Sequence, residues 1–469
     1  MLLFSNFLIL ITSIIFLFFF NNKTKIISIL SSGIVLIISC FMLLENFNKI
    51  NSTYNIDAIF KIDGLSILFY FLSALLIFLC LIFIWKENKN LYKEFAINLL
   101  IIEFLLLIVF SSNNLLLFYI SFEGILIPMF LIIGVWGSRE RKIRAVYLFF
   151  FYTLVGSIML LIGILYIYNK TGSLNIDYLS SYKFSTVEEN LLWLSFFLSF
   201  ASKIPLFPLH IWLPEAHVEA PTVGSVLLAG ILLKLGVYGF LRFNLILFPN
   251  ASLFFSPAVL LLALMGIIYS SLSAIRQTDI KRIIAYSSIA HMNLVVLGIF
   301  SFNVLGLEGS ILQSVSHGFV AGGLFFLIGI LYDRYHSRAL YYYGGLIHVM
   351  PLYSILLMLL TFSNIALPGT SSFVGEFLLL LGVYKDSFWS AFLGSTGVIL
   401  CGIYSLWLLN RLVFGNLKLD YTVSFKDINI RELLSVLPLI VFSLFSGIYP
   451  YFFSSFIEFF SSNLFFIVL

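Results

Sequence analysis

The sequence predicts an all-α, polytopic membrane protein with about 14 transmembrane helices. Of its 469 residues, 61% are hydrophobic and only 10% are charged, whereas about 25% of the residues of an average soluble protein are charged. Apolar runs of about 20 residues, the length of a helix that crosses a bilayer, follow one another along the chain. This composition excludes a soluble protein with one buried core.

Fourteen apolar segments are separated by short polar connections. The first has no positively charged amino-terminal region and no small-residue cleavage site, so we expect a retained helix and not a signal peptide. The predicted spans are residues 2–20, 26–44, 62–85, 94–111, 114–136, 146–168, 190–213, 222–247, 255–275, 283–301, 304–332, 346–383, 388–410 and 433–455.

The distribution of Lys and Arg over the connections supports this number of spans. Eighteen lie in or beside the odd-numbered connections and six in or beside the even-numbered ones. The positive-inside rule predicts such a bias for a correct count, and it places both termini on the less basic side. The net charge of +4 does not indicate nucleic-acid binding, because no basic patch stands outside the short connections.

Two of the spans are expected to be broken helices. The seventh carries Pro205 and Pro208 close to Lys203, and the twelfth carries Pro368 and Gly369. Proline removes a backbone donor, and non-helical backbone at membrane depth persists only where protein or water satisfies it. Transporters place ion sites at such breaks, often at matching positions of two inverted repeats.

The two breaks lie five spans apart, which fits a five-helix unit that is repeated with inverted topology. An odd-numbered unit inverts its orientation in the membrane when it is repeated. We therefore expect four parts: an N-terminal three-helix segment at 1–93, a first five-helix repeat at 94–247, a second at 255–410, and a loop with a C-terminal helix at 411–469.

Four ionisable side chains lie deep in the apolar segments, namely Glu123, Lys203, Lys234 and Glu376. A charge at this depth costs about 2.5–3.5 kcal/mol on insertion scales, so such residues are rare without a partner or water. An acid and a base in a dry helix bundle can be switched by small changes in distance or hydration. We expect a proton relay; a fixed structural ion pair is the alternative for Glu123 and Lys203.

The other two charges have different structural alternatives. Lys234 lies about 12 residues from either end of its span, too deep for its side chain to reach the interface easily. Glu376 follows Gly369 by seven residues, about 10 Å along a helix, and its alternative role is a helix cap. The four leucines that follow it argue against an exposed cap.

Several further residues are weaker candidates. His291 and His317 lie inside spans 10 and 11, and histidine can pass a proton through its two ring nitrogens, although a satisfied core histidine is the alternative. For His210 and His217, which flank the end of span 7, loop structure is an equal alternative. Glu103 in span 4 is a candidate accessory site.

Redox and nucleotide motifs are absent from the sequence. Cys40, Cys80 and Cys401 are far apart in apolar segments, which predicts neither a disulfide framework nor a metal site. There is no dinucleotide fingerprint, no phosphate loop and no cysteine cluster for an iron–sulfur centre. The free energy for proton pumping is therefore expected to come from another protein chain.

The runs Lys203–Thr222 and Gly224–Lys234 resemble the signature of the antiporter-like membrane subunits of respiratory complex I, the NADH:ubiquinone oxidoreductase. The resemblance covers nearly the whole chain and implies 14 helices, two inverted five-helix repeats (spans 4–8 and 9–13) and broken helices 7 and 12. An acid at 376 resembles one of these subunits, whereas its sisters use lysine. The family's relay residues fall on Glu123, Lys203, Lys234, His291, His317 and Glu376.

The resemblance implies a proton-translocating subunit that has no cofactor of its own. NADH, FMN, iron–sulfur clusters and ubiquinone are expected in partner subunits, and the partners include the sister antiporter-like subunits and membrane lipids. The composition implies AT-rich codons, which favours a mitochondrial over a bacterial protein. We therefore expect the mitochondrial inner membrane. A subunit of a multi-chain cation/proton antiporter and a plastid or bacterial relative remain alternatives, which the co-purifying subunits would distinguish. We also expect a lateral wire through Lys234, His291, His317 and Glu376.

Overall fold

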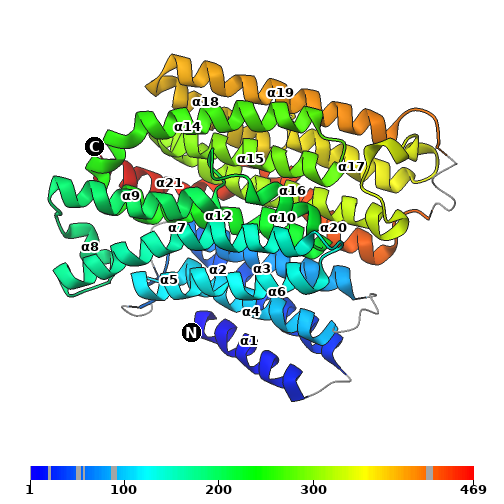
Figure 1. The fold of residues 1–469 in the computed structure, drawn as a ribbon. Helices are drawn as coiled ribbons and strands as arrows, with labels where there is room; N and C mark the ends of the chain where they lie inside the picture. The colour runs from blue at the N-terminus through cyan, green and yellow to red at the C-terminus, as the bar shows by residue number, and fades with distance from the viewer. Residues whose placement is uncertain are drawn as a thin grey trace. The chain divides into compact units, whose positions relative to one another are not determined.

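The computed structural model describes residues 2–19, 23–48, 54–55, 59–85, 92–418 and 426–468, which are predominantly helical (Figure 1). Within these residues, twelve helical segments are long and apolar enough to cross a membrane. They correspond to twelve of the predicted spans. The seventh and twelfth spans are each divided into shorter helices at their prolines. The predicted fold class, a polytopic helical membrane protein with two broken helices, is confirmed.

The chain divides into two compact units, which are described separately. The first consists of Met1–Lys203, Lys234–Phe255 and Phe452–Leu469, and the second of Ile204–Leu233 and Ser256–Tyr451.

The first unit is built mainly of membrane-length helices, with a short antiparallel pairing of two strands, β1 (Tyr54–Asn55) and β2 (Lys61–Ile62). Helix α3 packs against α2 and α4, and α7 packs against α9. The helices are α1 (Leu2–Phe19), α2 (Thr24–Asn48), α3 (Gly64–Ile84), α4 (Tyr92–Ser111), α5 (Leu115–Gly124), α6 (Leu126–Trp136), α7 (Lys142–Thr171), α8 (Ile176–Ser181), α9 (Thr186–Lys203), α12 (Leu233–Gly239), η2 (Phe240–Asn244), α13 (Leu245–Leu247) and α21 (Tyr451–Val468).

Helix α3 is buried along almost its whole length and begins at a charged cap. The Asp63 side chain accepts a hydrogen bond from the backbone N–H of Ser66, and its carboxylate forms an ion pair with Arg242. Burial raises the pKa of Asp63, but the Arg242 charge and the Ser66 hydrogen bonds lower it more, so the net shift is downward. The cap therefore stays ionised and satisfies backbone donors that the helix leaves free.

The second unit is organised around α16 (Val304–Tyr335), whose residues are mostly buried and which packs against α11, α15, α17, α18 and α20. Glycines allow a close approach between α16 and α18. The other helices are α10 (Trp212–Glu219), α11 (Thr222–Leu227), η1 (Leu228–Leu232), α14 (Pro249–Arg276), α15 (Ile280–Ile299), η3 (Leu340–Tyr342), η4 (Leu346–His348), α17 (Pro351–Asn364), α18 (Ser371–Asp386), α19 (Phe388–Val413) and α20 (Ile430–Ile448).

The break in the twelfth span lies between α17 and α18. Pro368 has no N–H to donate to the carbonyl of Asn364, where α17 ends. Gly369 has a left-handed backbone with φ of 93°, which glycine adopts without steric cost. The Ser372 hydroxyl donates to the carbonyl of Ser363. The protein thus satisfies part of the backbone that the break exposes, as membrane depth requires.

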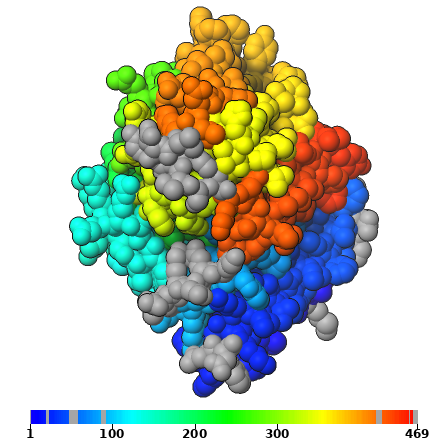
Figure 2. Space-filling model, turned by 90° about the vertical axis from the view of Figure 1, so that its right-hand side faces the viewer, coloured from blue at the N-terminus to red at the C-terminus, as the bar shows by residue number. Residues whose placement is uncertain are grey.

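Two connections predicted on the basic side lie together at one end of the second unit. Figure 2 shows this end, where yellow and orange segments of the chain adjoin. The N–H of Gly345 donates to the carbonyl of Phe414 at 3.1 Å. Arg334 donates to Glu432 at 2.6 Å. Both connections are odd-numbered, so their contact agrees with the predicted alternation of spans across the membrane.

Three features differ from the predicted spans. The span expected at 433–455 ends at Ile448, and a new helix begins at Tyr451, because Pro450 disfavours helical backbone at the residue before it. The span at 114–136 is interrupted at Ile125, between α5 and α6. The span at 222–247 contains the π-helical segments η1 and η2. Hydrophobicity alone does not reveal these last two irregularities.

Candidate functional site

The six predicted relay residues divide equally between the two units. Glu123 is partly buried, and the other five side chains are buried, with exposed fractions between 0% for Lys234 and 6% for His291. The first unit contains Glu123, Lys203 and Lys234, and the second contains His291, His317 and Glu376.

In the first unit, Glu123 lies at the end of α5, directly before the interruption at Ile125. Its carboxylate interacts with the Ser157 hydroxyl of α7 and electrostatically with Lys203. In the described part of the chain no direct ion pair joins Glu123 to Lys203, and Oε1 of Glu123 has no hydrogen-bond partner there. The two charges are therefore coupled without being locked together.

Lys203 is the last residue of α9, where the helix dipole favours a positive charge. Its ammonium lies 4.5 Å from the centre of the Phe122 ring, a cation–π contact. The approach of α7 to α9 depends on Gly156, because a Cβ there would lie 2.6 Å from the Ser202 hydroxyl and 3.0 Å from the Leu198 carbonyl. This close packing positions Ser157 and Lys203 on facing helices.

Lys234 is fully buried in α12, a short α-helical stretch between η1 and η2. π-Helical segments inside longer helices occur frequently at functional sites. Each carries an extra residue in its turn, so the segments change the direction in which neighbouring side chains point. The sequence placed Lys234 in the middle of its span, but it did not predict this irregular backbone.

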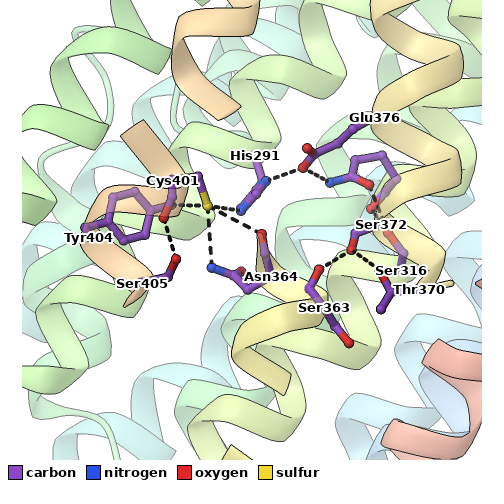
Figure 3. A network of polar contacts seen from close by, with 11 residues as sticks. His291, Ser316, Ser363, Asn364, Thr370, Ser372, Glu376, Cys401, Tyr404 and Ser405 are labelled. Atoms are coloured by element: carbon purple, nitrogen blue, oxygen red, sulfur yellow. Dashed lines mark hydrogen bonds and ion pairs between the residues drawn. The ribbon is translucent and has the colours of Figure 1, made fainter. Parts of the chain in front are cut away.

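In the second unit, Glu376 and His291 form a buried pair (Figure 3). Nδ1 of His291 lies 3.0 Å from Oε1 of Glu376. The Gln313 amide donates to the same oxygen at 2.8 Å, and Ser316 donates to the Gln313 amide oxygen at 3.1 Å. Helices α15 and α16 thus each contribute a side chain to the carboxylate of Glu376 on α18. Hydrogen bonds of this kind offset part of the free-energy cost of burying a charge.

The second ring nitrogen of His291 also has a neighbour. Sγ of Cys401 lies 3.6 Å from Nε2 of His291, and the Tyr404 hydroxyl donates to Sγ at 3.0 Å. The Cys401 thiol also lies 3.4 Å from the Asn364 carbonyl oxygen. A cavity of about 10 Å³ borders Cys401, His291 and Glu376, close to the minimum that holds one water molecule.

His317 is the neighbour of His291 on α16. The two ring centroids are 5.8 Å apart and the planes are inclined by 53°. The structure therefore brings His317, His291 and Glu376 into one cluster.

The weaker candidates have different surroundings. His210 lies between Phe207 and Tyr269, with ring centroids at 5.5 and 5.3 Å, and His217 stacks on Phe325 at 4.7 Å. Such aromatic contacts fit the alternative that His210 and His217 serve the loop structure. Glu103 is fully buried, and neither carboxylate oxygen has a hydrogen-bond partner in the described residues.

The sequence did not point to Ser157, Gln313, Cys401 or Tyr404. All three cysteines are free, and Cys401 is in contact with His291, a predicted relay residue. One signal was available: Gln313 precedes His317 by four residues and so shares its helix face. Likewise, Cys401 and Tyr404 are three residues apart in an otherwise mostly apolar helix.

Comparisons with known proteins identify the family of this chain. Residues 112–401 match the family described as NADH:quinone oxidoreductase/Mrp antiporter, TM. The chain is 53% identical to NADH-ubiquinone oxidoreductase chain 4 of Chondrus crispus over 88% of this chain and 84% of the relative. It is 47% identical to the chain 4 of Arabidopsis thaliana, over 93% and 91%. A chain of respiratory complex I from Thermus thermophilus superposes with a TM-score of 0.91 over both full chains, at 29% identity.

Proposed function

The chain belongs to the NADH:quinone oxidoreductase/Mrp antiporter family, and we propose that its two buried groups of ionisable side chains carry protons across the membrane. It is a multi-pass, proton-pumping subunit in the membrane arm of NADH:ubiquinone oxidoreductase, in the mitochondrial inner membrane, with other subunits of that complex around it. The relatives favour this role over a separate cation/proton antiporter. Electron transfer from NADH to ubiquinone takes place, in this proposal, on cofactors of partner subunits.

The observation that carries the assignment of residues is the pair of His291 and Glu376. A histidine with a partner at each nitrogen can accept a proton on one side and release one on the other. Here Nδ1 faces a carboxylate at 3.0 Å, and Nε2 faces a thiol at 3.6 Å. Gln313 holds the carboxylate in place while both protonation states of the pair remain compatible with its amide. A relay requires this combination of a fixed position and an exchangeable proton.

The first group supports the same function by a different geometry. Glu123 and Lys203 influence each other electrostatically but have no direct ion pair in the described chain. A small change in their separation or hydration alters which of them holds the proton. Lys234 supplies a further buried amino group in the same unit, within irregular helical backbone. We therefore assign Glu123, Lys203 and Lys234 to a relay in the first unit and His317, His291 and Glu376 to a relay in the second. The lateral wire that would join Lys234 to the other three stays a prediction.

The test is Glu376→Gln in the assembled complex, with proton pumping and NADH oxidation measured on the same membranes. An amide has nearly the shape of the carboxyl group but cannot carry a proton, so we expect the pumping attributable to this path to fall roughly tenfold or more, the scale of a lost proton-transfer group. Glu140→Gln is the matched control, because Glu140 is exposed in the connection before α7. A wild-type ratio of protons to electrons in Glu376→Gln would contradict the assignment.

A further inference from the structure

We propose that Cys401 is a proton-relay residue that joins Tyr404 to the His291–Glu376 pair, so that a four-member chain supplies protons to Glu376. The proposal rests on the proposed function, since it extends the relay already assigned to Glu376. Its members come from three helices of the second unit: Glu376 from α18, His291 from α15, and Cys401 and Tyr404 from α19.

The donors in this chain follow one direction (Figure 3). The Tyr404 hydroxyl donates to Sγ of Cys401 at 3.0 Å. The thiol can then donate to Nε2 of His291 at 3.6 Å, and Nδ1–H of His291 donates to Oε1 of Glu376 at 3.0 Å. Cys401 and His291 each accept from the preceding member and donate to the following one, which is the arrangement that proton hopping requires.

A thiol that served only to fill space would need none of these contacts, because buried cysteine usually behaves as a small apolar side chain. Cys401 is 3% exposed and contacts a hydroxyl, a ring nitrogen, and both the carbonyl oxygen and the side-chain amide of Asn364. The adjacent cavity of about 10 Å³ leaves room for small movements of the thiol and the imidazole. Polar contacts on three sides therefore favour a relay role.

The carbonyl of Asn364 gives the thiol hydrogen a second acceptor, at 3.4 Å. This carbonyl lacks its helical donor because the residue four positions later is Pro368. The single thiol hydrogen can point to the Asn364 carbonyl, in which case the hydrogen-bonded chain is interrupted at Cys401. When it points to Nε2 of His291, the chain is continuous from Tyr404 to Glu376. The helix break in the twelfth span thus supplies the resting acceptor of the relay.

The chain leads from Glu376 toward the basic ends of α15 and α19. Beyond Tyr404, the Ser287 hydroxyl interacts with the tyrosine and donates to the carbonyl of Ile284 at 2.8 Å. Ser287 lies four residues before His291, about 6 Å nearer the start of α15, where Lys281 and Arg282 lie. Tyr404 similarly lies nearer than Cys401 to the end of α19, which carries Arg411. The positive-inside rule places these ends on the matrix side.

The proton balance of one passage is simple. Glu376 gains the Nδ1 proton of His291, Nε2 of His291 gains the thiol proton, and Cys401 gains the proton of the Tyr404 hydroxyl. Tyr404 is reprotonated by water that enters from the matrix side along Ser287. One O–H bond forms at Glu376 and one O–H bond of that water breaks, which leaves a hydroxide on the matrix side, so no redox step is involved. The chain resets when the imidazole and the thiol reorient.

The experiment compares two matched pairs of variants in the assembled complex. Cys401→Ser and Cys401→Thr keep a hydroxyl that can accept and donate, whereas Cys401→Ala and Cys401→Val do not. We expect the protons pumped per electron to fall in the Ala and Val variants, and in Tyr404→Phe, and the Ser and Thr variants to restore the ratio. Cys80→Ala, which removes a buried thiol of α3, should pump normally.

Equal pumping by the Ala and Ser variants would overturn the role of Cys401. If Glu376→Gln stops pumping while Cys401→Ala does not, only this inference fails; if Glu376→Gln pumps normally, the proposed function fails with it. Should the variants at 401 not assemble, Tyr404→Phe provides the decision. This variant removes the hydroxyl that donates to Sγ of Cys401, and a normal ratio of protons to electrons in the assembled Tyr404→Phe complex contradicts the proposal.

Discussion

Glu123 shows what a single buried residue contributes. Its carboxylate lies beside an interruption in its helix, touches Ser157, and shares an electrostatic interaction with Lys203 without a direct ion pair in the described residues. A locked pair would hold its proton, whereas a coupled but separated pair can exchange it. We predict that Glu123→Gln lowers pumping coupled to NADH oxidation roughly tenfold or more, with assembly retained, as measured by pumping assays and native gels.

Glu94→Gln is a suitable control for this prediction, because Glu94 undergoes the same chemical change on the exposed first turn of α4. The control should match the wild type in both assays. An assembled Glu123→Gln complex with a normal ratio of protons to electrons would show that Glu123 has only a structural role.

At the scale of elements, the contact of α16 with α18 decides whether Glu376 reaches its partners. A Cβ at Gly375 would lie 2.8 Å from the backbone nitrogen of Gln313 and 2.8 Å from its amide oxygen. Overpacking of this kind costs about 1–3 kcal/mol, and any separation of the helices lengthens the Gln313–Glu376 hydrogen bond. We predict that Gly375→Ala lowers both the thermal stability of the complex and its pumping ratio.

Gly394→Ala on α19 provides the comparison, because its Cβ would have its nearest neighbour at 3.6 Å, an ordinary contact. This control should leave the melting temperature unchanged or slightly raised, since alanine favours helix more than glycine does. Normal stability and pumping in Gly375→Ala would mean that the α16–α18 contact tolerates displacement.

At the scale of the whole molecule, the orientation in the membrane follows from the charges of the connections. Ser138 lies exposed between α6 and α7, in an odd-numbered connection, and Ser180 lies exposed in α8, in an even-numbered one. We predict that a cysteine at 180 is labelled by a membrane-impermeant reagent added to intact mitoplasts, and that a cysteine at 138 is labelled only after the membrane is permeabilised. The reverse pattern would overturn the assignment of the basic connections to the matrix.

The sequence by itself determined the class of fold, the positions of most spans, both proline-linked breaks and the candidate relay residues. These properties are local: an apolar run of sufficient length, a proline without an N–H, or a charge within lipid-length sequence each has a direct physical consequence. The last predicted span extends beyond the observed end of α20 at Ile448, and this difference also follows from the local effect of Pro450.

Only the tertiary structure decided which groups are in contact. Gln313 and Glu376 are separated by 63 residues, and His291 and Cys401 by 110, so their contacts depend on how four helices are rotated and how closely glycines let them approach. The interruption at Ile125 and the π-helical turns around Lys234 are likewise not marked by proline or by a loss of hydrophobicity. Hydrophobic pattern locates a helix in the membrane, but side-chain packing sets the direction in which each polar group points.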